Sequence, residues 1–404
     1  MDANSRRWSS PQTLLYSRDA AWNFMGPRAD FGLVIQSSFS NSHLARLRFT
    51  CTTVLCYLAE TDTAPIPISL TKQAVIRNMP VKASDKPVKN ASGRYDNVDF
   101  RKAAGFKYPP VKCSYNRRDV LLFANAIGVS ADERHFLYEL HPRFAAFPTF
   151  PINLFFKTTD QDVYDFIKKC TPTDVPGTPP FDAQRSVDGE RGIEIVNPVP
   201  VSSDGLDLEI HQKVLGVYDK GGSMILEAEQ ELLDVRTGTV YVRMTSTAFG
   251  MGQGGYGGPR GPSRPSPRIP DRAPDAVHVF RTTPELALLY RLCGDYNPMH
   301  ADDEFGRRAG FKGHILQGLG TWNIAAHGIL RELGGSDPAR FKAFTARFKS
   351  VVYPGETLET RMWKVGIEKG CDVVMFETVV REDGRVALSN GQCKILQASA
   401  GSKL

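Results

Sequence analysis

Two blocks of alternating, β-branched sequence constrain the fold of this chain more than any other feature. In the first block, residues 206–217, 224–235 and 239–249 have the pattern of strands, and the turns 219–222 and 236–238 between them contain glycine, which is typical of hairpins. Four further strands are predicted nearer the C-terminus, at residues 342–352, 357–368, 372–382 and 386–396. Helical patterns precede both blocks, so we predict an α+β fold with antiparallel sheets around helices.

The helical patterns differ in how deeply we expect them to be buried. Residues 115–128 carry apolar side chains at helical spacing and end at Gly128, whereas residues 315–330 are apolar on most sides. Residues 250–276, between the two halves, are rich in Gly, Pro and Arg and cannot form a core, so they are predicted to be a linker. With one aromatic and no repeated Arg-Gly-Gly unit, this segment does not favour nucleic-acid binding.

A short polar turn, residues 294–300 (GDYNPMH), follows the first helical pattern of the second half. Gly294 permits a backbone conformation that a Cβ would obstruct, and Pro298 ends the helix. Asp295 and His300 lie five residues apart across this bend, so both side chains can face one cavity. A carboxylate and an imidazole beside one water molecule can act as general acid and base, with Asn297 orienting them.

A motif of this kind alone more often represents a helix-ending glycine, a capping aspartate and a hydrogen-bonded histidine. The sequence after it favours catalysis, because Gly313, Gly318 and Gly320 stand where the buried helix begins. Glycine lets a ligand approach the backbone, and the first N–H groups of a helix can bind a developing negative oxygen.

Residues 294–302 (GDYNPMHAD), with the following A-G-F and I-L-x-G-L segments, resemble the signature of the type-2 enoyl-CoA hydratases, the MaoC-like dehydratases of the hot-dog fold. The resemblance continues through residues 347–358 (RFKSVVYPGETL) and includes the first half, residues 103–262. It implies a double hot-dog fold, with two antiparallel sheets each wrapping a central helix, in the eukaryotic peroxisomal form of the family.

The resemblance also implies roles for individual residues. Asp295 and His300 would be the catalytic pair, with Asn297 assisting. The backbone N–H of Gly318 would belong to the oxyanion hole, and Gln317 would help to position the substrate. No metal and no redox cofactor are implied, because coenzyme A is part of the substrate.

Three positions near this site depart from the family pattern. His314 stands where proline is usual, Gln317 where histidine is usual and Gly320 where cysteine is common. The acid and base are intact, so these changes bear on substrate positioning and chain-length preference.

The first half repeats the helix-and-strand order without the catalytic groups. When Gly128 is aligned with Gly294, the catalytic positions are occupied by Val129, Ala131 and Arg134. Asp132 and His135 are close by, but their spacing differs, and we predict that they lie in a solvated loop. One active site per chain follows.

An aromatic segment of the first half, residues 141–151, has two interpretations. Phe144, Phe147 and Phe150 either pack as core around an irregular turn or, as the resemblance implies, line a pocket for the acyl tail.

The predicted organisation has five parts. These are an N-terminal extension that is disordered or a gene-model addition (1–102), a non-catalytic half (103–249), the linker (250–276), a catalytic half (277–398) and a tail (399–404). The tail ends in Ser402, Lys403 and Leu404, the tripeptide of a peroxisomal address read by an import receptor. This address predicts the peroxisomal matrix.

Composition adds few constraints. The net charge of +6 suits an anionic partner but is common for protein surfaces, and seven dispersed cysteines argue against a disulfide framework or a zinc site. No secretory signal or apolar run of membrane-spanning length occurs. Pairing of the halves within one chain, with further assembly into a homodimer, is predicted from the resemblance.

The sequence therefore predicts an enzyme that hydrates trans-2-enoyl-CoA to (3R)-3-hydroxyacyl-CoA, reversibly, in peroxisomal fatty acyl-CoA metabolism. One alternative is a hydratase or dehydratase that makes the acyl part of a secondary metabolite. Another alternative is a catalytically weak acyl-CoA-binding protein. A thioesterase of the same fold is a further alternative, but a thioesterase would not explain the Asp–Asn–His motif.

Overall fold

The computed structural model of the protein describes residues 98–169, 174–181, 186–263 and 266–398, together with 88–89, 91 and 95–96. Ten of its strands form one antiparallel sheet: β3 (Val111–Cys113), β4 (Ser186–Ile195), β5 (Leu208–Asp219), β6 (Ser223–Asp234), β7 (Thr239–Met251), β8 (Ala276–Arg281), β9 (Phe341–Phe348), β10 (Thr357–Glu368), β11 (Cys371–Val380) and β12 (Val386–Leu396). Two short strands, β1 (Val88–Lys89) and β2 (Tyr95–Asp96), pair with each other. The predicted tripeptide at 402–404 lies outside the described residues.

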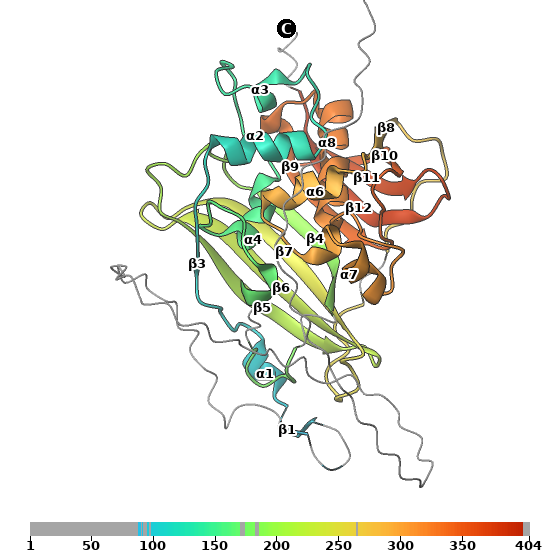
Figure 1. Ribbon diagram of the computed structural model, residues 1–404. Helices are drawn as coiled ribbons and strands as arrows, with labels where there is room; N and C mark the ends of the chain where they lie inside the picture. Colours follow the sequence, from blue (N-terminus) through green and yellow to red (C-terminus); the bar gives the residue numbers. More distant parts are fainter. Residues whose placement is uncertain are drawn as a thin grey trace, which may run out of the picture. The chain divides into compact units, whose positions relative to one another are not determined.

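The order of strands in the sheet reveals the internal repeat. The sheet runs β3-β5-β6-β7-β4-β9-β12-β11-β10-β8, so each half arranges its five strands in the same order from the outer edge inward (Figure 1). The halves join where β4 pairs with β9, from Glu190 opposite Arg347 to Glu194 opposite Ala343. The double hot-dog fold is confirmed, but the two predicted sheets are continuous across this junction.

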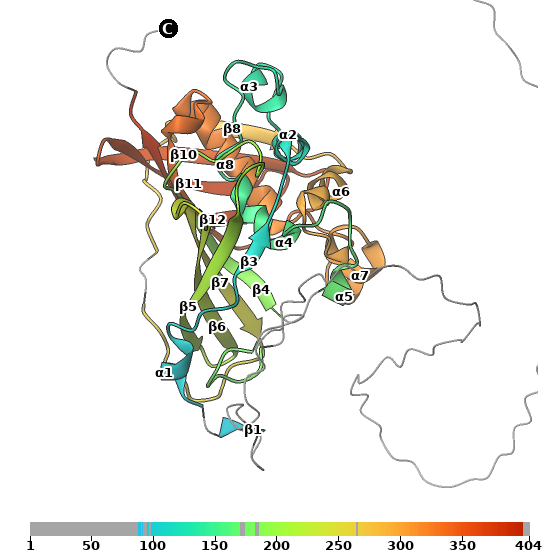
Figure 2. The same cartoon turned by 90° about the vertical axis from the view of Figure 1, so that its left-hand side faces the viewer.

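The helices lie mainly on one side of the first half's strands (Figure 2). They are α1 (Phe100–Ala103), α2 (Arg117–Ala126), α3 (Arg134–Leu137), η2 (Phe150–Asn153), α4 (Leu154–Lys157), α5 (Phe166–Lys169), α6 (Leu286–Tyr290), η4 (Arg291–Cys293), η5 (Pro298–His300), α7 (Asp303–Arg308), α8 (Gly318–Gly334) and η6 (Pro338–Arg340). In the described part of the first half, no helix has the length of α8. The expectation of a central helix in each half is therefore met only in the second.

Helix α8 is the central helix of the second half. Its apolar residues are buried almost all round, as predicted, and it packs on β8, β9, β10 and β12. A Cβ at Gly328 would lie 2.5 Å from the ring of His278 on β8, so glycine allows the helix to approach the sheet closely. The helix ends at Gly334, and the next residue, Gly335, adopts the left-handed conformation typical of a C-terminal cap.

The predicted strand boundaries agree with the structure to within a few residues. The largest difference is in β9, which ends at Phe348 rather than continuing to residue 352. The chain leaves the sheet there because the Val352 carbonyl accepts a hydrogen bond from the backbone N–H of Leu316, just before α8. This hydrogen bond connects the segment that follows β9 to the segment that precedes the central helix.

The beginning of the predicted linker is part of the folded structure. Strand β7 runs to Met251, and the Asp219 carboxylate accepts hydrogen bonds from the backbone of Gly255 and Gly257 at 2.9 and 2.8 Å. The ring of Tyr256 stacks on that of Phe100 at a centroid distance of 5.4 Å. This segment therefore packs against the end of β5 and against α1.

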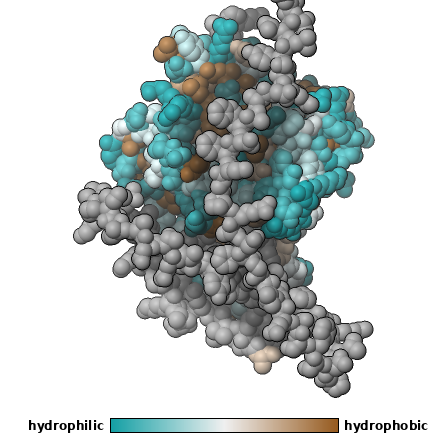
Figure 3. Space-filling model, in the orientation of Figure 1, coloured by the Kyte–Doolittle hydropathy of each residue, from teal (hydrophilic) through white to brown (hydrophobic). Residues whose placement is uncertain are grey.

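Hydrophobic side chains are unevenly distributed on the visible face of the described residues. Figure 3 shows them gathered toward the middle of the upper part, with hydrophilic residues on both sides. Leu288 in α6 and Leu292 in η4 remain 42% and 37% exposed.

None of the helices among the described residues combines the length and hydrophobicity needed to cross a bilayer. The predicted homodimer stays a prediction.

Candidate active site

The catalytic turn starts at Gly294, after α6 and η4. Gly294 has φ of +126°, and a Cβ there would lie 2.8 Å from the backbone nitrogen of Lys157 in the first half. The Tyr164 hydroxyl, also from the first half, donates to the Gly294 carbonyl at 2.9 Å. The turn of the second half is thus held by residues of the first, and glycine is required at its start.

Asp295 and His300 face each other at this turn, as predicted. The His300 Nε2 lies 3.7 Å from the Asp295 Oδ2, and their side chains are 10% and 14% exposed. The His300 Nδ1 lies 2.9 Å from the carbonyl of Ile315, so this nitrogen carries a proton and donates it. The other imidazole nitrogen is left facing the carboxyl group.

The separation of the two groups suits a bridging molecule. At 3.7 Å they are too far apart for a direct hydrogen bond, so a water molecule or a substrate oxygen between them can contact both. Burial raises the pKa of Asp295, while the positive charge of protonated His300 acts in the opposite direction. A buried carboxyl beside an imidazole is an arrangement suited to proton transfer.

Asn297 shapes the turn between the two catalytic groups. Its side-chain oxygen accepts a hydrogen bond from the backbone N–H of Met299 at 3.0 Å, which caps the short helix η5 that carries His300. Its own backbone N–H donates to the Asp295 Oδ1 at 3.3 Å. These contacts orient the acid and base, while a direct contact of Asn297 with water stays a prediction.

The N-terminus of α8 is tied to the catalytic turn. The backbone N–H of Ile315 donates to the carbonyl of Met299 at 3.1 Å, on the chain just before Gly318, the first residue of α8. A Cβ at Gly318 would lie 3.2 Å from the ring of Phe348, so little space remains for a side chain. Helix α8 thus presents backbone N–H groups close to His300.

The two residues that depart from the family pattern beside Gly318 have structural partners. The Gln317 side chain is fully buried and donates through Nε2 to the Ala287 carbonyl of α6 at 3.1 Å, which ties the two helices together. The His314 Nδ1 lies 2.5 Å from the Asp303 Oδ1 of α7. Participation of Gln317 in substrate positioning stays a prediction.

The predicted pocket phenylalanines belong to the core. Phe147 and Phe150 are 0% and 2% exposed and pack around Phe123, while Phe144 lies partly buried at the edge of the same cluster. This arrangement corresponds to the packing interpretation, and contact with an acyl tail stays a prediction.

A cavity of about 360 Å³ borders the catalytic turn at Tyr296. It is lined from both halves by Asn116, Arg118, Asp119, Leu122, Lys157, Asp160, Gln161, Asp162, Val163, Tyr164, Leu292 and Tyr296. The rings of Tyr164 and Tyr296 meet edge to face, with 4.7 Å between centroids. No local sequence pattern indicated this cavity, because its walls come from segments far apart in the chain.

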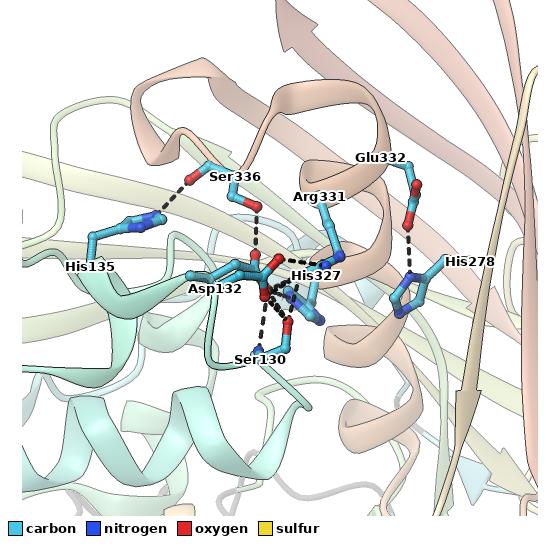
Figure 4. Close-up of polar contacts among 9 residues, drawn as sticks. Ser130, Asp132, His135, His278, His327, Arg331, Glu332 and Ser336 are labelled. Carbon is cyan, nitrogen blue, oxygen red and sulfur yellow. Dashed lines mark hydrogen bonds and ion pairs between the residues drawn. The ribbon is translucent and has the colours of Figure 1, made fainter.

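The expectation of a solvated loop holds for Asp132, which lies in an exposed turn, but is wrong for His135, which belongs to α3 and is half-buried. The Asp132 carboxylate forms an ion pair with Arg331 of α8 at 2.8 Å, and the His135 Nε2 lies 2.7 Å from the Ser336 carbonyl (Figure 4). Between them, Glu133 is 3% exposed and lies 2.8 Å from the Nε2 of buried His327. The segment of the first half that corresponds to the catalytic turn therefore makes polar contacts with the C-terminal part of the central helix.

A long buried helix on an antiparallel sheet, with an Asp–His pair at its N-terminus, defines a hot-dog protein equipped for addition or elimination of water. Two family models match the chain: the MFE-2 hydratase 2 N-terminal domain over residues 113–252 and the MaoC like domain over residues 266–385. The chain therefore belongs to the MaoC-like hydratase and dehydratase family, in the form with two hot-dog halves. It is a hydro-lyase.

Similar proteins support this assignment over most of their length. Probable dehydratase NIT22 of Ajellomyces capsulatus is 45% identical over 303 residues, 71% of this chain and 80% of that protein. Enoyl-CoA hydratase 2, peroxisomal, of Arabidopsis thaliana is 33% identical over 300 residues, 70% of this chain and 91% of that protein. The crystal structure of a MaoC-like dehydratase from Phytophthora capsici superposes with a TM-score of 0.66 at 35% identity, covering 74% of this chain and 99% of the other.

Proposed function

We propose that the protein hydrates trans-2-enoyl-CoA to (3R)-3-hydroxyacyl-CoA and catalyses the reverse dehydration. The observation that carries this proposal is the separation of 3.7 Å between Asp295 and His300 beside the first residues of α8. The relative named enoyl-CoA hydratase 2 supports the choice of an enoyl thioester as substrate.

The proposed mechanism uses both groups in one cycle. The Asp295 carboxylate removes a proton from the bridging water as its oxygen attacks C3, and the electron pair of the double bond moves toward the thioester. Protonated His300 delivers a proton from Nε2 to C2, so the enzyme has gained one proton on Asp295 and lost one from His300. Proton transfer between the two groups through the next water restores the starting state.

The thioester oxygen becomes negatively charged during this reaction. The backbone N–H of Gly318 at the start of α8 is our candidate donor for this oxygen, where the unpaired N–H groups and the helix dipole favour negative charge. Acid–base chemistry of this kind requires neither a metal nor a redox cofactor, and coenzyme A is the carrier of the substrate.

The experiment follows the loss of enoyl-thioester absorbance with crotonyl-CoA and a decenoyl-CoA, with chiral analysis of the product. We expect formation of the (3R) alcohol, and the ratio of the two rates will report the chain-length preference. An (S) product would contradict the stereochemical assignment. Binding of both thioesters without turnover would contradict the hydratase proposal and favour an acyl-CoA-binding function.

A second candidate is dehydration in the synthesis of a secondary metabolite's acyl group. It is favoured by the relative from Ajellomyces capsulatus, which is named a probable dehydratase and shares 45% identity. The same acid and base perform both directions, so the two candidates differ in substrate. Slow turnover of both simple enoyl thioesters, together with fast dehydration of a substituted 3-hydroxyacyl thioester, would favour this candidate.

We also propose that the enzyme works in the peroxisomal matrix. The tripeptide Ser402, Lys403 and Leu404 and the word peroxisomal in a relative's name support this location. A fluorescent protein fused ahead of the full chain should accumulate in peroxisomes, and deletion of the tripeptide should leave it in the cytosol. Unchanged peroxisomal fluorescence after the deletion would contradict the role of the tripeptide.

A further inference from the structure

A segment of the first half contacts the main chain of the catalytic turn directly. Helix α4 ends at Lys157, whose backbone nitrogen would lie 2.8 Å from a Cβ at Gly294. The Tyr164 hydroxyl, a few residues further on, lies 2.9 Å from the Gly294 carbonyl and 2.9 Å from the Phe156 carbonyl of α4. This hydroxyl therefore links α4 of the first half to the residue that precedes Asp295.

The hydrogen bond to Gly294 restrains the main chain of Asp295. A peptide unit is planar, so the Gly294 carbonyl and the Asp295 nitrogen lie in one plane and move together. Gly294 has no Cβ and a φ of +126°, so its own backbone offers this plane little resistance to rotation. A hydrogen bond to the Gly294 carbonyl therefore limits the direction in which the Asp295 side chain leaves the main chain.

The ring of Tyr164 contacts the residue on the other side of Asp295. It meets the Tyr296 ring edge to face, with 4.7 Å between centroids, and the Arg291 guanidinium lies 5.3 Å from the centroid of the same Tyr296 ring. Both tyrosines line the cavity of about 360 Å³, so core side chains do not enclose the turn on this side. The two contacts of Tyr164 thus flank Asp295, at positions 294 and 296.

Tyr164 is itself held by its own segment of the first half. The Lys169 Nζ lies 4.0 Å from the centroid of the Tyr164 ring and forms an ion pair with the Asp160 carboxylate. An ammonium group over the face of a phenol ring is attracted to it. The orientation of the ring is therefore set within the first half and transmitted to the catalytic turn.

We propose that Tyr164, supplied by the first half, is a positioning residue for the reaction of the second half: its hydroxyl and ring hold the two residues that flank Asp295, and so keep the carboxylate at the distance from His300 that a bridging water requires. This inference rests on the hydration function proposed above. Displacement of a reacting group by about 1 Å can lower a rate about a hundredfold, so these two contacts bear on kcat. The non-catalytic half thus takes part in catalysis although it lacks the acid and base.

The first test is the effect of Tyr164→Phe, which removes the hydroxyl and retains the ring. We expect kcat for the hydration of crotonyl-CoA to fall about tenfold and KM to change by less than about twofold, because the change displaces Asp295 and leaves the groups that bind the thioester in place. Tyr164→Leu removes the ring contact as well, and its kcat should fall further.

Tyr115→Phe is the matched control. The Tyr115 hydroxyl donates to the Pro200 carbonyl at 2.8 Å, so it forms a bond of the same kind whose partners both belong to the first half. This variant should lose thermal stability and retain kcat. Wild-type kcat in Tyr164→Phe, or equal falls in kcat for Tyr164→Phe and Tyr115→Phe, would overturn the proposal. A rise in KM at unchanged kcat would overturn it as well, because it would assign Tyr164 to substrate binding.

A second measurement separates this proposal from the proposed function. Hydrogen exchange of the full chain, followed by mass spectrometry on peptides that cover residues 291–300, requires no turnover. We expect faster exchange in this segment for Tyr164→Phe than for wild type, and unchanged exchange in the C-terminal part of α8. This result supports the positioning of the turn by Tyr164 even if the wild type fails to hydrate the thioesters. Unchanged exchange at residues 291–300 overturns it even if hydration is confirmed.

Discussion

Asp295→Asn is expected to lower kcat/KM for enoyl-CoA hydration by about a thousandfold or more. The amide retains the shape of the side chain and the hydrogen bond from the Asn297 backbone, but it cannot accept a proton from water. His300→Ala should cause a loss of similar size, because the proton for C2 then has no positioned donor. Both variants are assayed by the loss of enoyl-thioester absorbance, with circular dichroism and thermal unfolding to establish that they fold.

The double variant provides a further criterion. Because the two groups act in one proton-transfer cycle, Asp295→Asn with His300→Ala should be little worse than either single variant, as is found for residues that act as a unit. Asp302→Asn is a suitable control, since this exposed aspartate caps α7 through the backbone of Glu304 at 2.8 Å and lies outside the proposed chemistry. Retention of a tenth or more of the activity by Asp295→Asn would exclude the proposed base.

The parts of the fold and site that local sequence predicted are those with local causes. Strands β10 and β12 have the predicted bounds because the alternation of side chains lies within each strand and turn residues flank it. The catalytic turn was found because Gly294, Asp295 and His300 are neighbours in sequence, and one motif contains both the backbone requirement and the chemistry.

The features that the sequence did not predict depend on distant residues. Glu133 and His327 are 194 positions apart, and each alone has the pattern of an ordinary polar residue. His135 was assigned to solvent, and the ion pair of Asp132 was missed, for the same reason, since their partners Ser336 and Arg331 belong to the other half of the chain. Likewise, β4 pairs with β9 across a large distance in sequence, and no local pattern encodes this pairing.

The two halves hold the central helix at both ends in different ways. At its start, the catalytic turn is connected to α8 through the hydrogen bond from His300 to Ile315. Near the C-terminal end of α8, Glu133 of the first half contacts His327 and Arg331. Glu133 belongs to the turn that corresponds to the catalytic turn but lacks the acid and base. The degenerate repeat therefore preserves a contact with α8 while its catalytic groups are absent.

Glu133→Gln is expected to lower the free energy of unfolding by about 3 kcal/mol or more at neutral pH, because it removes the anionic partner of buried His327 and one of the two carboxylates that pair with Arg331. The measurement is chemical denaturation of the purified protein. Asp132→Asn is the matched control: this aspartate also contacts Arg331, but its side chain is 64% exposed, so the expected loss is about 0–1 kcal/mol. Equal losses in the free energy of unfolding for the two variants would show that the buried Glu133 carboxylate contributes no more to stability than the exposed Asp132 carboxylate.

The pH dependence distinguishes the charge of Glu133 from its packing. Burial alone raises the pKa of Glu133, but hydrogen bonds from His327, Ser336 and the Ser130 backbone outweigh it and hold the pKa well below the ordinary value of 4.5. A lowered pKa in the folded state contributes stability that is fully present above the unfolded value and is lost as the pH falls toward the folded one. The difference in stability between wild type and Glu133→Gln should therefore be constant near neutrality and narrow as the pH falls below about 4.5. A difference that remains constant throughout the acid range would mean that the contact stabilises the fold through shape rather than charge.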